Sequence, residues 1–351
     1  LGSCRYKLKD WHEDETVYQK ITDCFQQRQI GAFFYIGGND SMDTVMKLSE
    51  YVKEKGIDTK IIGIPKTIDN DLCITDHTPG FGSAAKYVAT TMQEIIRDSS
   101  VYSVPSVTIV EIMGRHAGWL TASSAILHAN GETAPHLIYV PECKFSLQQF
   151  LEDTRKKMAK HKAVIIAISE GVEVADTAAF QSGVTDEFGH KYLSGIGKYL
   201  EGVVREQIGC KVRSIELNVM QRCSSHLCSK TDIDEAVQIG AAGVQTALAG
   251  ETGKVMIFQR LYDQPYTIIV TSTEAVNIAN QERFLPPSYI NETGNNITDA
   301  ALQYPDAQWF THTLQDTGIR FKVTCIKRKG CYFPYCTIRY NNHKKEYSLP
   351  V

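Results

Sequence analysis

Short apolar runs, each followed by a polar turn and then by residues with helical spacing, recur along this chain of 351 residues. The runs Ala32–Ile36, Lys60–Ile64, Ser106–Met113, His136–Val140 and Ala163–Ile168 have the length and composition of buried strands. Segments with apolar residues at helical spacing lie between and after them, at 16–28, 45–52, 82–97, 147–158 and 232–248. Strands that alternate with helices predict a layered α/β fold with mostly parallel sheets.

Composition bounds the class of protein. A hydrophobic content of 43% over this length is enough for one large domain or two of ordinary size. The net charge of −3, without basic blocks, gives no reason to expect nucleic acid or a membrane surface as a partner. The sequence contains no run that could span a bilayer and no signal segment, and its ten cysteines are scattered. These features predict a soluble cytoplasmic protein with reduced thiols.

The segment Pro65–Asp71 directly follows one of the apolar runs. Ligands of parallel α/β sheets bind at the carboxyl ends of strands, which is where this segment places its two carboxylates. An extended chain sends alternate side chains to one side, so Asp69 and Asp71 can face one pocket beside Thr67 and Lys66. We therefore expect the segment to lie at the centre of a functional site.

A second polar turn, Gly37-Gly38-Asn39-Asp40-Ser41, joins the run Ala32–Ile36 to a helical pattern. A strand, a glycine pair and a helix bring backbone amides up to a phosphate. The turn is neither a six-position dinucleotide fingerprint nor a Walker loop, which disfavours a nucleotide-binding oxidoreductase. Its Asp40 is unexpected, because a carboxylate repels a phosphate placed against it.

Further turns carry an arginine or an acid. Met113-Gly114-Arg115 follows another apolar run, and its glycine leaves room for a ligand that the arginine can hold. Glu170 follows the run 163–168, and the segment 211–219 with the residues after it contributes Arg213 and Arg222. The long helix after them has its expected N-cap at Thr231 or Asp232.

Five motifs in this order and spacing closely resemble the 6-phosphofructokinase family over roughly 1–304. They are Gly-Gly-Asn-Asp-Ser, Pro-Lys-Thr-Ile-Asp-Asn-Asp, Met-Gly-Arg-His-Ala-Gly-Trp, Ile-Ser-Glu-Gly and a later Gln-Arg. The resemblance implies two similar α/β domains and an enzyme that moves a phosphoryl group onto the 1-hydroxyl of fructose 6-phosphate. It also implies a homo-oligomer, because in this family one sugar-phosphate arginine comes from a neighbouring subunit.

The resemblance assigns a role to each matching position. Asp69 is implied as the general base, and Lys66, Asp40 and Arg115 as the other catalytic residues. Mg²⁺ is implied at Asp71 and Asn39. The sugar phosphate is implied at Thr67, Ile68, Asp69, Met113, Gly114, Arg115, Glu170, Arg213 and Arg222, and the donor phosphates at Arg5, Gly37, Gly38, Asp40, Ser41 and Lys66.

Two positions bear on the phosphoryl donor. ATP-using members of the family have glycine at the places of Asp40 and Lys66, whereas pyrophosphate-using members have aspartate and lysine, as here. Asp40 places bulk and negative charge where the α-phosphate of a nucleotide would lie, and Lys66 offers a cation to a compact diphosphate. The resemblance therefore favours a glycolytic, pyrophosphate-dependent transferase. The alternatives are an ATP-dependent 6-phosphofructokinase and a catalytically silent regulatory subunit.

The sequence also departs from the family pattern. Asn39 replaces an aspartate that helps to hold Mg²⁺, Val219 replaces a histidine or tyrosine near the sugar phosphate, and no arginine is found near Ser106. By the resemblance, a first strand and its phosphate turn precede Leu1. We expect a donor domain at 1–80 and about 221–275, a sugar domain at 81–220 and about 276–305, and a divergent tail at 306–351.

Overall fold

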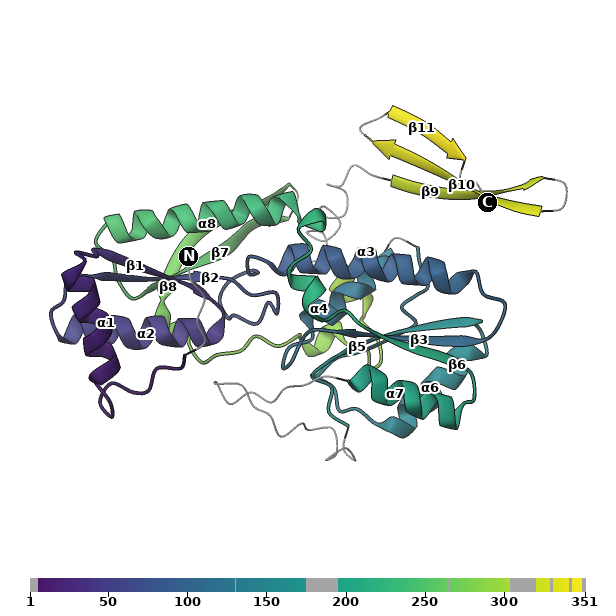
Figure 1. Cartoon of the computed structure of the whole chain (residues 1–351), viewed down its shortest axis with the longest axis horizontal. Helices are drawn as coiled ribbons and strands as arrows, with labels where there is room; N and C mark the ends of the chain where they lie inside the picture. Colours follow the sequence, from purple (N-terminus) through teal and green to yellow (C-terminus); the bar gives the residue numbers. More distant parts are fainter. Residues whose placement is uncertain are drawn as a thin grey trace.

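The computed structural model describes residues 6–129, 131–174, 195–263 and 265–303, together with the backbone of strands at 320–328, 331–340 and 343–348. Two four-stranded sheets lie side by side, and helices cover both faces of each (Figure 1). Neighbouring strands in these two sheets are parallel, apart from the antiparallel hairpin of the last two strands of the first sheet. The predicted layered α/β fold is confirmed.

The first sheet has the strand order β1-β2-β7-β8. Its strands are β1 (Ala32–Gly37), β2 (Lys60–Pro65), β7 (Lys254–Asp263) and β8 (Tyr266–Glu274). Helices α1 (Thr16–Gln27) and α2 (Asn39–Glu54) lie on one face, and α8 (Lys230–Leu248) lies on the other (Figure 1). The alternation of side chains along β2 explains both contacts, because Ile61 packs in the core under α1 and α2 while Ile62 packs in the core under α8.

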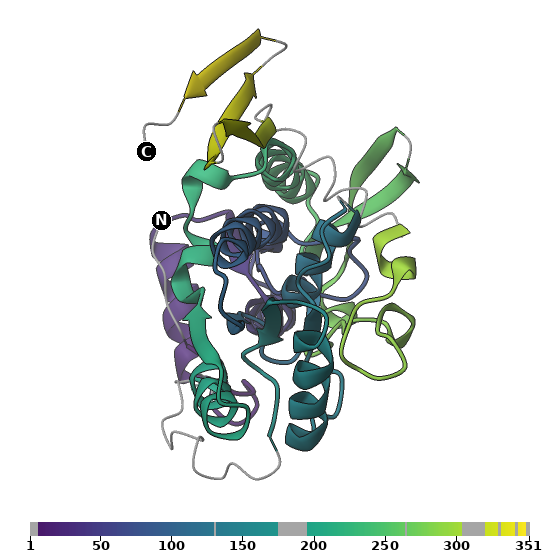
Figure 2. The same cartoon turned by 90° about the vertical axis from the view of Figure 1, so that its right-hand side faces the viewer.

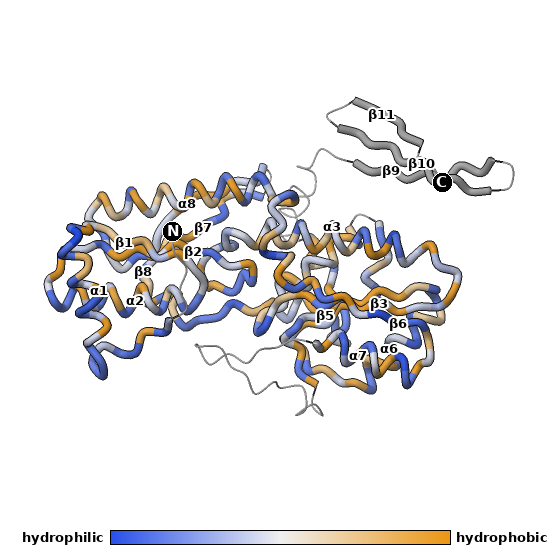
Figure 3. The backbone as a smooth tube through the Cα atoms, in the orientation of Figure 1, coloured by the Kyte–Doolittle hydropathy of each residue, from blue (hydrophilic) through white to orange (hydrophobic). Residues whose placement is uncertain are grey.

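The second sheet has the strand order β4-β5-β3-β6 and is parallel throughout. Its strands are β3 (Ser106–Ile112), β4 (Leu137–Tyr139), β5 (Ala163–Ser169) and β6 (Lys211–Glu216). One face is covered by α3 (Phe81–Ser100), α4 (Trp119–Ala122), η1 (Ser123–Ala125) and α5 (Ile126–Ala129), and the other by α6 (Leu147–Met158) and α7 (Ile196–Gln207). Every residue of β3 is buried, and the strongest hydrophobic colouring in Figure 3 runs along β3 and β5.

Two expectations from the sequence need correction. The segment 211–219, which alternates loosely in the sequence, is a strand only as far as Glu216, because Asn218 adopts a left-handed conformation and the chain turns into η2 (Asn218–Arg222). The N-cap of α8 is Ser229, whose side chain accepts a bond from the backbone of Asp232. Asp232 itself accepts from the backbone amides of Gly80 and Ser83 at 2.8 and 3.0 Å, so it caps α3 instead.

The hairpin of β7 and β8 was not predicted at all. It pairs Lys254 with Glu274 at its open end and Asp263 with Tyr266 near its turn. The β-branched run Thr267–Thr271 is the signal in the sequence that could have indicated it. The hairpin lies beyond the last of the five motifs, so none of them points to it.

The remaining described elements are short or separate. After β8, the chain leaves the first sheet at Ala279 and joins the core of the second at Leu285. The short helices are η3 (Ser225–Leu227), η4 (Ala275–Asn277), η5 (Pro287–Tyr289) and α9 (Asp299–Gln303). Strands β9 (Arg320–Arg328), β10 (Cys331–Tyr340) and β11 (His343–Ser348) form an antiparallel sheet that stands apart from both layers (Figure 2). The division of strands between the sheets supports the domain boundaries that we propose from the sequence.

Candidate active site

The glycine turn and the loop after β2 lie next to each other because β1 and β2 are parallel neighbours. The last paired residues are Gly37 and Pro65, and the amide of Lys66 donates to the carbonyl of Gly37 at 2.9 Å. A side chain at Gly37 would place its Cβ 2.0 Å from Oγ of Ser41 in the first turn of α2, so only glycine fits there. The fold therefore brings two of the predicted motifs to one edge of the first sheet.

The loop at residues 65–71, called the aspartate loop below, is fixed by hydrogen bonds. The Thr67 hydroxyl donates to Oδ2 of Asp69 at 3.3 Å and accepts from the amide of Asp69 at 3.1 Å. Thr78 holds the loop from behind, because its hydroxyl donates to the carbonyl of Thr67 and its amide donates to Oδ1 of Asn70. Asn70 is buried in a left-handed conformation, which turns the chain between the two aspartates.

Asp69 lies at the point where the motifs of the two sheets meet. Burial raises the pKa of Asp69, while the Thr67 hydroxyl and the positive charges of Arg115, Lys66 and Arg222 oppose that rise. Three cations from separate segments are therefore close enough to influence one carboxylate. A carboxylate that is partly desolvated and surrounded by cations is suited to accept a proton beside an anionic substrate.

Asp71 is the second carboxylate of the aspartate loop. Burial raises its pKa to about 7, and the nearby charges of Asp69 and Glu282 add to the rise. Its Oδ1 atom is buried and has no hydrogen-bond partner among the described residues. A buried carboxylate oxygen with no donor is an oxygen ligand available to a cation.

The second sheet contributes Gly114, Arg115 and Glu170, which follow the neighbouring strands β3 and β5. The Ser169 hydroxyl donates to the carbonyl of Gly114 at 2.7 Å, and the amide of Glu170 donates to the carbonyl of Ile112 at 2.9 Å. Gly114 has φ +143, and a Cβ there would lie 2.7 Å from the carbonyl oxygen of Ala117. Glycine is therefore required for this turn.

The charge of Glu170 interacts with the charge of Asp69 in the aspartate loop. Burial raises the pKa of Glu170 to about 7, the charges of Asp69 and Glu111 raise it further, and the charge of Arg115 lowers it. Glu170, Asp69 and Arg115 thus influence one another although they follow strands of different sheets. The predicted site is assembled between the two sheets.

The two arginines predicted to bind the sugar phosphate, Arg222 and Arg213, lie in different places. Arg222 is exposed in η2, and its charge lowers the pKa of Asp69, so the structure brings it to the site. Arg213 lies in the edge strand β6, where it pairs with Thr108 of β3, and it forms an ion pair with Asp98 at 3.4 Å. Within one chain, Arg213 does not join the other predicted residues. Its assignment to a neighbouring subunit's site stays a prediction.

Other predicted residues differ in exposure. Lys66 is exposed, Asp40 and Ser41 are partly buried in the first turn of α2, and Ile68 and Met113 pack partly against the core of the second sheet. Arg5 lies outside the described residues. Its predicted contact with the donor phosphates is therefore not placed.

The segment Asn280–Arg283 was missed by the sequence reasoning, although it contacts three of the motifs. Asn39 donates through Nδ2 to the carbonyl of Gln281 and accepts through Oδ1 from the amide of Asn280, both at 2.9 Å. Glu282 pairs with His116 at 2.8 Å. These contacts are long-range, so no local pattern in the sequence could have revealed them.

Arg283 completes the contacts of this segment. Its amide donates to the carbonyl of Asp71 at 2.7 Å, and its carbonyl accepts from the indole of Trp119 at 2.9 Å. Its guanidinium lies 4.4 Å from the Trp119 ring centroid and donates to the carbonyls of Thr75 and Asp76. Arg283 therefore links the loop that carries both aspartates to the turn that carries Arg115.

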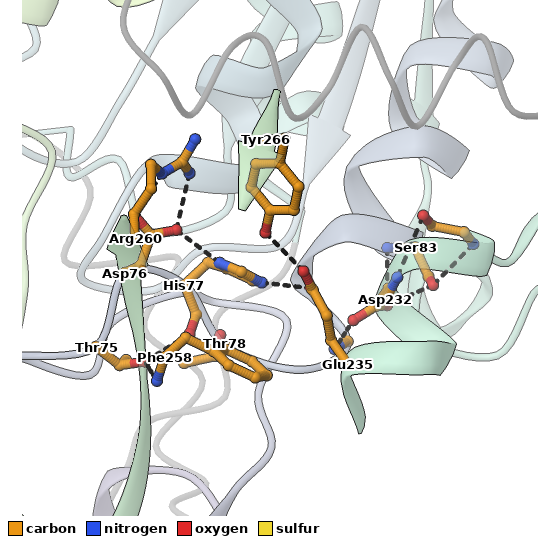
Figure 4. A network of polar contacts seen from close by, with 12 residues as sticks. Thr75, Asp76, His77, Thr78, Ser83, Asp232, Glu235, Phe258, Arg260 and Tyr266 are labelled. Atoms are coloured by element: carbon orange, nitrogen blue, oxygen red, sulfur yellow. Dashed lines mark hydrogen bonds and ion pairs between the residues drawn. The ribbon is translucent and has the colours of Figure 1, made fainter. Parts of the chain in front are cut away.

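A buried polar network lies behind the aspartate loop (Figure 4). The imidazole of His77 is bonded to Asp76 at 2.7 Å and to Glu235 of α8 at 2.8 Å, and Figure 4 shows the ring between the two carboxylates. Arg260 donates to both oxygens of Asp76, and the Tyr266 hydroxyl donates to Glu235. The network joins α8, β7 and β8 to the segment of Thr78, which in turn holds the aspartate loop.

Other kinds of site are absent from the described part of the chain. No group of three or more His, Cys, Asp or Glu side chains among the described residues could hold a metal ion by itself. None of the helices in the same ranges is long and apolar enough to cross a membrane. The cysteines at 24, 73, 143, 210, 223 and 228 are free.

The chain has two layered α/β units whose strand ends carry carboxylates, cations and glycine turns, an arrangement suited to the transfer of a phosphoryl group. A family model described as Phosphofructokinase matches residues 1–247. The chain therefore belongs to the phosphofructokinase family, and the resemblance seen in the sequence is confirmed.

Individual relatives agree with this assignment. The chain is 39% identical over 307 residues to the pyrophosphate--fructose 6-phosphate 1-phosphotransferase of Halomonas elongata, covering 87% of this chain and 73% of the relative. It is 38% identical to the protein of the same name from Xanthomonas campestris pv. campestris, covering 87% and 74%. The crystal structure of a pyrophosphate-dependent phosphofructokinase from Marinobacter aquaeolei matches with a TM-score of 0.75 and 29% identity, covering 100% of this chain and 79% of that one.

Proposed function

We propose that this chain transfers a phosphoryl group from pyrophosphate to the 1-hydroxyl of fructose 6-phosphate, giving fructose 1,6-bisphosphate and phosphate in a reversible step of glycolysis. The single observation that carries the proposal is the position of Asp69 among Arg115, Lys66 and Arg222, between the strand ends of two sheets. Phosphoryl transfer needs an aligned hydroxyl, a base and positive charge around the transferring oxygens. The residues around Asp69 are suited to all three.

Asp69 is the proposed general base. Burial raises the pKa of its carboxyl group, which makes the carboxylate a stronger base than an exposed aspartate. The bond from Thr67 to Oδ2 orients the carboxylate. The sugar hydroxyl would lose its proton to Asp69 as the oxygen bonds to phosphorus and the pyrophosphate bond breaks.

Arg115 and Lys66 are the proposed electrostatic partners of the transferring group. Both are close enough to Asp69 for their charges to lower its pKa. Fixed positive charge around the equatorial oxygens is the larger part of catalysis in such reactions. The two residues come from different sheets, so the site is complete only when both units are in place.

The donor is assigned from the edge of the first sheet. Asp40 occupies the first turn of α2, beside the Gly37–Gly38 turn, and Lys66 is exposed next to it. We propose that Lys66, the glycine pair Gly37–Gly38 and the side chain of Ser41 bind pyrophosphate, because the Ser41 amide already donates to the carbonyl of Gly38. The carboxylate of Asp40 disfavours the further phosphate of a nucleotide.

Mg²⁺ is the cofactor that this chemistry requires. The buried, unpartnered Oδ1 of Asp71 fits such an ion, because Mg²⁺ is commonly held by one or two carboxylates together with substrate phosphates. Asn39 would be the weaker second ligand, since its amide is already bonded to the 280–281 backbone. Bound Mg²⁺ would neutralise charge on the phosphate oxygens.

The sugar phosphate is assigned to the second sheet. We propose that Glu170 accepts bonds from its hydroxyls, that Met113 and Gly114 line it, and that Arg222 binds its phosphate. Arg213 would serve the site of a neighbouring subunit in a homo-oligomer, because it lies apart from Asp69 in its own chain. A cytoplasmic location suits these metabolites.

The test is a steady-state assay with fructose 6-phosphate, Mg²⁺ and either pyrophosphate or ATP. We expect turnover with pyrophosphate and little with ATP. Turnover with ATP alone would assign the ATP-dependent alternative. Sugar-phosphate binding without turnover from either donor would assign the silent regulatory subunit instead.

A further inference from the structure

The N-termini of helices α3 and α8 meet behind the aspartate loop, where Asp232 of α8 joins them (Figure 4). Because α3 covers the second sheet and α8 the first, this joint connects the two units. Asp232 is only 5% exposed, and both of its carboxylate oxygens accept hydrogen bonds. Oδ1 accepts from the amide of Gly80 at 2.8 Å, and Oδ2 accepts from the amide and the hydroxyl of Ser83. The carboxylate suits this place, because the start of a helix favours negative charge.

The Ser83 hydroxyl connects this carboxylate to the start of α8. It donates to Oδ2 of Asp232 and accepts from the amide of Ser229 at 3.1 Å. Ser229 is the N-cap of α8, and its hydroxyl accepts from the amide of Asp232 at 3.4 Å. The three residues therefore form a closed ring of hydrogen bonds. The backbone directly before the ring is also held, because Nζ of Lys86 donates to the carbonyl of Cys228 at 3.0 Å.

On one side, the ring is attached to the aspartate loop. Gly80, whose amide donates to Asp232, pairs with Thr67 in a parallel bridge. The Thr67 hydroxyl in turn donates to Oδ2 of Asp69. Asp232 is therefore connected to the proposed general base through two residues, Gly80 and Thr67.

On the other side, the ring is attached to the turn that carries Arg222. The segment 223–228 joins Arg222 to Ser229, and both η2 and η3 pack against α3. Arg222 lies close enough to Asp69 for its charge to influence that carboxylate. The two ends of the connection through Asp232 thus meet again at the site.

We infer that Asp232 is a positioning residue, which fixes the distance between Arg222 and Asp69 although it does not itself contact the substrate. The inference rests on the proposed function, in which Arg222 binds the phosphate of fructose 6-phosphate and Asp69 accepts the proton of its 1-hydroxyl. One substrate can contact both residues only if their spacing matches its length. Groups that are already held in the bound arrangement cost less to order on binding. Asp232 holds this arrangement from the joint between α3 and α8.

The experiment measures the binding of fructose 6-phosphate by calorimetry, so it does not depend on turnover. Asp232→Asn keeps the size of the side chain but places an NH₂ donor where one oxygen accepts. We expect about 10-fold weaker binding, the usual effect of losing one hydrogen bond to a charged group. In an Arg222→Met background, the same substitution should change the affinity by less than about 2-fold, because the spacing no longer matters once one of the two contacts is gone.

Two variants of Ser83 and one control sharpen the result. Ser83→Ala removes the hydroxyl between Asp232 and Ser229 and keeps the amide, so binding should weaken by about 3-fold. Ser83→Thr keeps the hydroxyl and should bind like the unaltered chain. Asp234→Asn, on an exposed side chain of the same helix, is the matched control and should leave the affinity unchanged. The binding stoichiometry reports what share of each variant is folded.

Several results would overturn the inference. A loss of the same size in both backgrounds would mean that the effect does not pass through Arg222. An unchanged affinity, or a fall in stoichiometry alone, would assign Asp232 to the fold only, and a chain that binds no sugar phosphate also overturns it. If Arg222→Met binds too weakly for calorimetry, the Ser83 variants decide, and equal losses in Ser83→Ala and Ser83→Thr overturn the inference. If binding follows the expected pattern but neither donor gives turnover, the proposed reaction fails and the role of Asp232 stands.

Discussion

The two sheets meet at the site but build their halves of it differently. On the sugar side, β3 is buried at every residue, Glu111 included, and Gln221 and Gly114 are buried as well. On the donor side, most of β1 is only half-buried and Ile36 is 52% exposed, while Lys66 is open to solvent. The sugar half therefore depends on buried hydrogen bonds, whereas the donor half combines the buried aspartate loop with charges near the surface.

This difference indicates how substitutions in each half affect stability and binding. Buried polar groups are held by several partners, so a substitution among them affects stability together with binding. Charges near the surface can be replaced at little cost to the fold. We expect variants of the exposed donor-side charges to alter the choice of phosphoryl donor, and variants of buried groups in either half to alter sugar binding or stability.

The largest effect is expected at Asp69, which both halves surround. Asp69→Asn keeps the shape of the side chain and removes the base, so kcat should fall by about 10²- to 10⁴-fold. Binding of fructose 6-phosphate should remain, because the buried sugar half is unchanged. Steady-state kinetics and calorimetry measure the two quantities, with the exposed Asp58→Asn as the control. Retained kcat would show that Asp69 is not the base.

The next largest effect concerns the buried network behind the donor half. His77→Gln removes a cation from between Asp76 and Glu235 and leaves the buried Glu235 and the partly buried Asp76 with less compensation. Breaking a buried ion pair on one side costs roughly 3–5 kcal/mol of unfolding free energy. Chemical denaturation measures the loss, and His12→Gln at the surface is the matched control. A loss below about 1 kcal/mol would mean that the pairs contribute little.

The same network predicts a dependence of stability on pH. The two carboxylate partners raise the pKa of His77 to about 9 from its ordinary value of 6.5, against the effect of burial, and Arg260 and Tyr266 face the same group of acids. A raised pKa means that the protonated imidazole favours the folded state. Its contribution is complete below about pH 6.5 and is lost as the pH rises towards 9. Unfolding measured between about pH 6 and 9.5 should show this decline in the unaltered chain and a smaller one in His77→Gln.

Much of this site could be predicted because each motif is local. The strand, the turn and the following residues lie together in the sequence, so the carboxyl-end positions of Asp69, Arg115 and Glu170 followed from the order of elements. Fold class followed from the same alternation. The buried strands β3 and β5 were recognisable because continuous apolar runs of their length are typical of parallel strands covered on both faces.

The parts of the site and fold that the sequence did not predict depend on contacts between distant segments. Asn280–Arg283 binds Asn39, Asp71, His116 and Trp119 through backbone groups as much as side chains, and a backbone group has no sequence signature. Asp232 was expected to cap its own helix, but it caps α3 because the two helices meet in space. Such pairings are visible only in the folded chain.

The proposed role of the donor half in donor choice can be tested by removing its two charges. Asp40→Gly combined with Lys66→Gly should weaken the use of pyrophosphate by about tenfold or more, because a hydrogen bond to a charged group is lost. Turnover with ATP should rise at the same time, since the bulk and charge of Asp40 are gone. The KM for fructose 6-phosphate is the internal control and should not move. No gain with ATP would contradict the steric role of Asp40.

The smallest effect is expected at Asn39, which belongs to the donor half but bonds to the connecting segment. Asn39→Asp replaces the Nδ2 donor with an oxygen that faces the carbonyl of Gln281, so the unfolding free energy should fall by about 1 kcal/mol. The new carboxylate is also a better ligand for Mg²⁺ than an amide, so half-maximal activity should need less Mg²⁺. Denaturation and Mg²⁺ titration separate the two effects, with Asn277→Asp as the exposed control. An unchanged Mg²⁺ requirement together with lower stability would assign Asn39 to the fold alone, and would leave Asp71 as the protein's ligand for the ion.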